Sequence, residues 1–104
     1  AERLAERLLT YRVFPDDAGK MNLDVLAVGG GVLLVPQFTL AADTGSGTRA
    51  SFTTAAEPAV ARARYDQLVA AVKRWLPSVQ SGRFGADMQV RLTNDGPVTF
   101  SLRV

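Results

Sequence analysis

The chain has 104 residues, 47% of them hydrophobic, and a net charge of only +2, which predicts one small globular domain. No apolar run approaches the roughly 20 residues that a membrane-spanning helix needs, so we expect no membrane segment. The chain lacks both Cys and His, which excludes disulfides, thiolate nucleophiles and the commonest general base and metal ligand. An enzyme of this composition would rely on hydroxyls, carboxylates, amides, backbone groups or its substrate.

Apolar residues at helical spacing predict a helix over residues 1–12, followed by a turn at Pro15–Gly19. Residues 32–35 are apolar at every position, which is typical of a strand covered on both faces. Pro36 interrupts this strand, and Gln37 to Leu40 follow directly. A polar, glycine-containing loop over residues 43–49 comes next.

A second helix is predicted from Pro58, where a first helical turn tolerates proline, to Leu76, with Pro77 ending it. The last quarter of the chain alternates apolar and polar residues, which predicts two strands, residues 88–92 and 98–104, around a turn at residues 95–97. We therefore expect an α+β domain with a mixed or antiparallel sheet and two flanking helices.

Three runs could carry chemistry, and each also has a plain structural interpretation. Gly96-Pro97 is either a simple turn or a stiff one whose carbonyls reject a substituent by sterics, and proline permits a cis peptide there. The second run is either a strand end with an ordinary packed Phe38 or a site where the Gln37 amide donates to an oxyanion, and its Thr39 hydroxyl lacks a His base. Phe84, flanked by Gly82 and Gly85, either stacks on a nucleobase or belongs to the core.

Together the runs PQFTLAADT, GRFGADMQV and NDGPVTF resemble the D-aminoacyl-tRNA deacylase family, also called D-tyrosyl-tRNA deacylase. GKMN at residues 19–22 and SF at residues 51–52 add to the likeness, which extends in order over the whole chain. The resemblance implies hydrolysis of the ester that joins a D-amino acid, or glycine, to the terminal adenosine of tRNA. It also implies a barrel-like sheet and a cytoplasmic homodimer with its active site at the interface.

The resemblance also assigns roles to particular residues. Gly96 and Pro97 match a cis Gly-Pro pair that reaches into the partner's pocket and excludes L-amino acids. The residues facing the scissile ester, including two threonines considered for catalysis, are Gln37, Phe38, Thr39 and Thr99. The residues lining the adenosine pocket are Ala61, Phe84 and Met88. The aminoacyl ester is already activated, and its ribose 2′-hydroxyl can assist, so the implied reaction needs no metal or cofactor.

The chain departs from the family pattern in three respects. Pro36 stands where the family has Ser, and Ala50 stands where it usually has Pro. The family also begins with a strand-rich segment of roughly forty residues before the position of Ala1, a length that matters to so small a domain. We therefore expect a single domain over residues 1–104, truncated at its N-terminus, with exposed sheet edges and little activity if those strands are truly absent.

Two further hypotheses compete with deacylation. The first is a non-catalytic module that binds the tRNA 3′ end or dimerises. The second is a general esterase with a Thr nucleophile, which the absence of His disfavours.

Overall fold

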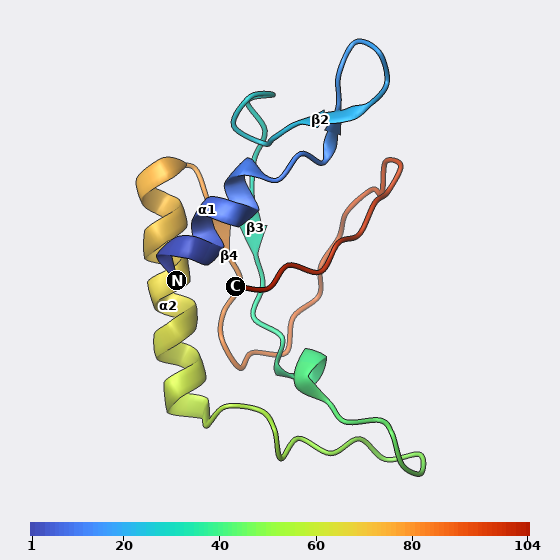
Figure 1. The fold of residues 1–104 in the computed structure, drawn as a ribbon. Coiled ribbons are helices and arrows are strands. Elements are labelled where there is room, and N and C mark those ends of the chain that lie inside the picture. The colour runs from blue at the N-terminus through green and yellow to red at the C-terminus, as the bar shows by residue number, and fades with distance from the viewer.

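Two helices packed against one another organise the chain, and the computed structural model describes all residues from 1 to 104 (Figure 1). Helix α1 covers Glu2–Thr10 and α2 covers Pro58–Trp75, so both predicted helices are confirmed with slightly shorter ends. Pro58 occupies the first turn of α2, where its missing N–H costs nothing. An ion pair between Arg74 and Glu2 joins the two helices at the surface.

The core is small and lies where the two helices meet the strand that follows residue 32. Leu9 of α1 and Val72 of α2 are its largest fully buried side chains. The other buried residues are Ala5, Val25, Leu34 and Ala71. Fifteen large apolar side chains remain exposed, which leaves much of the hydrophobic surface of the chain without a partner.

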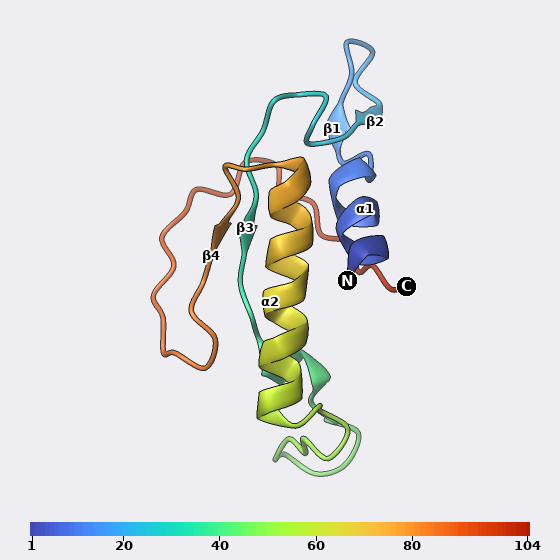
Figure 2. The same cartoon turned by 90° about the vertical axis from the view of Figure 1, so that its left-hand side faces the viewer.

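The strands form two separate ladders. Strands β1 (Phe14–Pro15) and β2 (Met21–Leu23) are antiparallel and flank the predicted turn at Pro15–Gly19, where Asp16 Oδ1 accepts the N–H groups of Ala18 and Lys20. Strands β3 (Leu33–Leu34) and β4 (Gln80–Ser81) are parallel and connected through α2 (Figure 2). The α+β class is confirmed, but the strands do not form the single continuous sheet that the resemblance implies.

One prediction about β3 is wrong. Leu33 is 55% exposed while Leu34 is buried, so only one face of this strand is covered. The predicted interruption at Pro36, by contrast, agrees with the structure, in which β3 ends at Leu34. Because Pro36 removes a ladder donor, the chain leaves the β conformation and forms a 3-10 helix at Phe38–Ala41.

The two C-terminal strands predicted over residues 88–92 and 98–104 are absent. Residues 87–104 make no backbone–backbone hydrogen bond, and they form a long open loop (Figure 1). Alternation specifies which side chains share a face, but a strand forms only where another strand pairs with it. The apolar residues of this loop, Val90, Leu92, Val98 and Phe100, are accordingly exposed.

The peptide joining Gly96 to Pro97 is trans, so the expected cis bond is a second correction in this loop. Gly96 adopts a φ of 110°, which suits glycine and reverses the chain direction. Nothing packs around the turn to offset the trans preference of about 0.5–1 kcal/mol of an X–Pro bond. In this single chain the segment is therefore an exposed turn with a trans Gly-Pro bond.

Neither helix combines the length and the apolar character needed to cross a membrane.

The small core makes each buried leucine important for stability. We expect Leu9→Ala to lower the free energy of unfolding by about 2–5 kcal/mol, because it removes a fully buried side chain and leaves a cavity. Leu40→Ala is the matched control, since Leu40 is 87% exposed and its loss should change stability by less than about 0.5 kcal/mol. Urea titrations followed by far-ultraviolet circular dichroism measure both, and equal effects would contradict this description of the core.

Candidate active site

A cavity of about 320 Å³ lies between the 3-10 helix, the start of α2 and the segment after β4. We name it the Gln37 cavity. Its lining residues are Pro36, Gln37, Phe38, Ala55, Ala56, Pro58, Ala61, Phe84, Gly85 and Ala86. None of these side chains is ionisable, so the cavity suits an uncharged planar group and offers hydrogen bonds only from an amide and the backbone.

The first wall comes from the turn after β3. Gln37 precedes the 3-10 helix in an extended conformation, and its Nε2 donates to Thr39 Oγ1 at 2.6 Å, which fixes the direction of the amide. The Phe38 ring packs against that of Phe52, with their centroids 5.0 Å apart. The Phe38 N–H donates no hydrogen bond, because it lies at the open N-terminal end of the 3-10 helix. This wall therefore presents one oriented amide and one free backbone donor.

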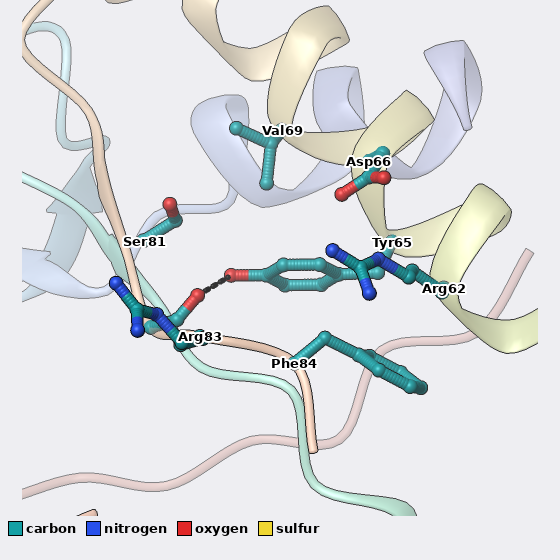
Figure 3. Close-up of a pocket in the computed structure, with 8 residues that line it drawn as sticks. Arg62, Tyr65, Asp66, Val69, Ser81, Arg83 and Phe84 are labelled. Atoms are coloured by element: carbon teal, nitrogen blue, oxygen red, sulfur yellow. Dashed lines mark hydrogen bonds between the residues drawn. The ribbon is translucent and has the colours of Figure 1, made fainter. Parts of the chain in front are cut away.

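The second wall is held to the first by Tyr65. This residue (Figure 3) lies one turn after Ala61 on α2. Its hydroxyl lies 2.9 Å from the Leu34 carbonyl oxygen and 3.1 Å from that of Gly82. The Gly82 N–H also donates to the Leu34 carbonyl at 2.7 Å. These bonds fix the ends of β3 and β4 beside the helix, and the Phe84 ring then lies 6.4 Å from that of Tyr65.

Met88 packs beside the cavity, against the segment that follows β4. Its sulfur accepts the Arg83 N–H at 3.4 Å, which folds the chain back after Gly85. A Cβ on Gly82 would lie 3.2 Å from Met88 Sδ and 3.3 Å from Pro36 Cδ, so glycine allows this close approach. Met88 therefore contacts Gly82 and Arg83, next to the cavity, and does not line the cavity itself.

The structure brings together most of the residues that the sequence predicts for the site. Gln37, Phe38, Ala61 and Phe84 line one cavity, and Thr39 is bonded to Gln37. Gly96, Pro97 and Thr99 are not part of it. They lie in the exposed C-terminal loop, whose tip points away from the 3-10 helix (Figure 1).

Two features of the site escaped the sequence interpretation. Tyr65 lies in the apolar stripe of α2, which indicated burial but gave no sign of the two carbonyls that its hydroxyl reaches. Ala55 and Ala56 line the cavity from a segment without any recognisable motif. As for metal ions, no group of three or more acidic side chains gathers anywhere in the structure.

Comparison with solved structures places this fold beside a known one. The c-Myc DNA Unwinding Element Binding Protein superposes with a TM-score of 0.83 and 32% sequence identity, over 93% of this chain and 66% of that one. The fold is thus an established α+β architecture of which this chain spans about two thirds.

Sequence comparisons then identify the family. The model of the family described as D-Tyr-tRNA(Tyr) deacylase matches residues 1–103. D-aminoacyl-tRNA deacylase of Herminiimonas arsenicoxydans is 64% identical over all of this chain and 70% of its own length. That of Teredinibacter turnerae is 59% identical over 96% of this chain and 69% of its own length. The chain belongs to the D-Tyr-tRNA(Tyr) deacylase family, a family of hydrolases, and the resemblance seen in its three sequence runs is confirmed.

The anchoring role of Tyr65 is testable by removing one oxygen. We expect Tyr65→Phe to lower the free energy of unfolding by about 0.5–1.5 kcal/mol, because the Gly82 carbonyl loses its donor. Tyr11→Phe is the control, since the Tyr11 hydroxyl makes no hydrogen bond and its loss should be nearly neutral. Denaturation midpoints measure both variants, and a Tyr65→Phe variant as stable as the parent chain would show that the hydroxyl does not hold the two walls together.

Proposed function

We propose that this chain hydrolyses the ester of D-aminoacyl-tRNA, and of Gly-tRNA, to release the amino acid and free tRNA as a proofreading step of translation. The observation that carries the proposal is the Gln37 cavity. It joins Gln37 and Phe38, which match ester-facing positions of the family, to Ala61 and Phe84, which match its adenosine pocket. A non-catalytic binding module is not favoured, because the relatives in several bacteria are named deacylases.

The chemistry fits a cavity without acids or bases. Water attacks the ester carbonyl, and the oxyanion accepts hydrogen bonds from the second Gln37 Nε2–H and the free Phe38 N–H. Collapse of the tetrahedral intermediate breaks the bond between the carbonyl carbon and the ribose oxygen, and the ribose leaves as the alcohol. The neighbouring 2′-hydroxyl of the substrate relays the proton from the attacking water to that oxygen. The amino acid leaves as the acid, and the protein contributes position and two donors.

Thr39 acts in this scheme as a positioning residue. Its Oγ1 already accepts the Gln37 amide, and no basic side chain of the cavity lies ready to activate it as a nucleophile. The reaction takes place where aminoacyl-tRNA is used, which we propose is the cytoplasm. A chain without cysteine suits that reducing compartment.

The first test concerns the amide. We expect the chain to release D-Tyr from D-Tyr-tRNA much faster than L-Tyr from L-Tyr-tRNA, and Gln37→Ala to lower kcat about 10²–10³-fold by removing one oxyanion donor. Thr39→Ala should cost about tenfold or less, since it only frees the amide to rotate, and Thr39→Ser should restore the rate. Ester loss from labelled aminoacyl-tRNA measures all three.

Two results would contradict this mechanism, and a third would contradict the proposed selectivity. Complete loss of turnover in a folded Thr39→Ala variant would make the hydroxyl a nucleophile. Full activity on a substrate that lacks the terminal 2′-hydroxyl would remove the proton relay. Equal release of D- and L-tyrosine would contradict the proposed selectivity for D-amino acids.

We further propose that two copies of the chain share the site. Gly96, Pro97 and Thr99 lie outside the Gln37 cavity of their own chain, and apolar side chains of the same loop are exposed, including Phe100 at 49%. Exposed apolar area of this kind favours association. In a homodimer, the loop of one copy would reach the cavity of its partner and set the preference for D-amino acids.

Mixing two defective variants tests this arrangement. Gln37→Ala lacks the amide donor, and deletion of Gly96 and Pro97 removes the turn. Each variant alone should be impaired. In an equal mixture about half of the dimers are heterodimers, and each heterodimer pairs one intact cavity with one intact loop. Mixing should therefore restore up to about one active site in four. Sedimentation of the parent chain checks the dimer. A monomer with full activity and selectivity, or a mixture no better than its components, would contradict a shared site.

A further inference from the structure

A second cavity, of about 410 Å³, adjoins the first one and carries positive charge (Figure 3). We name it the Arg62 cavity. It lies between α2 and the segment Ser81–Phe84, and its lining includes Arg62, Arg83 and Asp66. Phe84 lines both cavities, so one aromatic side chain separates an uncharged compartment from a cationic one.

Neither arginine has an ion-pair partner. The one ion pair of the structure joins Arg74 to Glu2, and Asp66, although four residues after Arg62 on α2, is not paired with it. Figure 3 shows the two guanidinium groups at opposite ends of the Tyr65 ring, with Arg83 beside its hydroxyl. Two unpaired guanidinium groups on either side of one cavity present donors for an anion with several oxygens.

The chain order links this cavity to the proposed substrate. Ala61 and Phe84 line the Gln37 cavity, and their sequence neighbours Arg62 and Arg83 line the Arg62 cavity. A nucleoside held against Ala61 and Phe84 with its 3′ ester at Gln37 would have its 5′ side directed across Phe84, toward both guanidinium groups. The group attached there in an RNA strand is a phosphodiester, which carries one negative charge.

We propose that the Arg62 cavity binds the phosphodiester that joins the terminal adenosine of tRNA to the preceding nucleotide. This inference rests on the proposed function and assigns Arg62 and Arg83 to the phosphate. Asp66, the only acidic residue of the lining, accepts a ribose hydroxyl of the preceding nucleotide. The cavity thus distinguishes an RNA end from a free aminoacyl nucleoside.

Binding of small ligands tests the phosphate contact without any turnover. The probes are the dinucleotide cytidylyl-adenosine and its methylphosphonate analogue, which has the same shape and no charge, and titration calorimetry measures their dissociation constants. We expect the charged dinucleotide to bind the parent chain about tenfold more tightly than the analogue, with a preference that weakens as salt rises.

Substitution of the two arginines should remove that preference. We expect Arg62→Gln combined with Arg83→Gln to bind both probes equally. Arg64→Gln is the control for the loss of a helix charge outside the cavity, because Arg64 lies on the same helix and lines a different cavity. The preference should persist in this control. Equal binding of the two probes by the parent chain, no binding of either, or a preference retained in the double variant would overturn the proposal.

Kinetics separate this inference from the proposed function. The double variant should raise KM for D-Tyr-tRNA about tenfold and leave kcat unchanged, while hydrolysis of D-tyrosyl-adenosine, which lacks the phosphodiester, should not change. Unaltered kinetics on D-Tyr-tRNA would refute the phosphate site and leave the deacylase function standing. Arginine-dependent binding of the dinucleotide without hydrolysis of any ester would support the phosphate site and refute the function.

Discussion

The hydroxyl of Tyr65 connects the three segments on which the rest of the structure depends. It reaches the carbonyls of Leu34 and Gly82 from α2, at the points where β3 and β4 end. The chain leaves β3 into the 3-10 helix and leaves β4 into the Phe84 segment, so one side chain sets the spacing of both cavity walls. A core of six residues leaves few other contacts that could do so.

The two adjoining cavities have different roles in the proposed reaction, one in orienting the ester and the other in binding the RNA strand. The Gln37 cavity contains no ionisable side chain, so its contribution is limited to orientation and two hydrogen-bond donors, which suits an ester that is already activated. The Arg62 cavity supplies charge at a distance from the reacting carbonyl. Binding energy from the RNA strand can therefore position the ester without placing a cation beside the developing oxyanion.

Local patterns predicted the helices, and the family resemblance predicted four of the ten residues that line the Gln37 cavity. Amphipathic spacing specifies α1 and α2. Gln37, Phe38, Ala61 and Phe84 meet because Tyr65 on α2 bonds the ends of the two strands that lead into the other walls. The prediction of two C-terminal strands was wrong because alternation indicates which side chains share a face but does not specify which strand pairs with them. Residues 87–104 have no pairing strand in this chain. Arg62 and Arg83 escaped notice because only the fold brings a helix and a loop together.

The Gln37 cavity is proposed to hold the aminoacyl end of the substrate, and a substrate analogue that stays bound tests this placement. A D-tyrosyl adenosine whose ester is replaced by an amide cannot be hydrolysed and can be titrated into the labelled chain while backbone-amide NMR signals are followed. We expect the signals of Gln37, Phe38, Ala61 and Gly85 to shift with one common affinity, while those of the Pro15–Gly19 turn stay unchanged. Shifts confined to residues outside both cavities would contradict it.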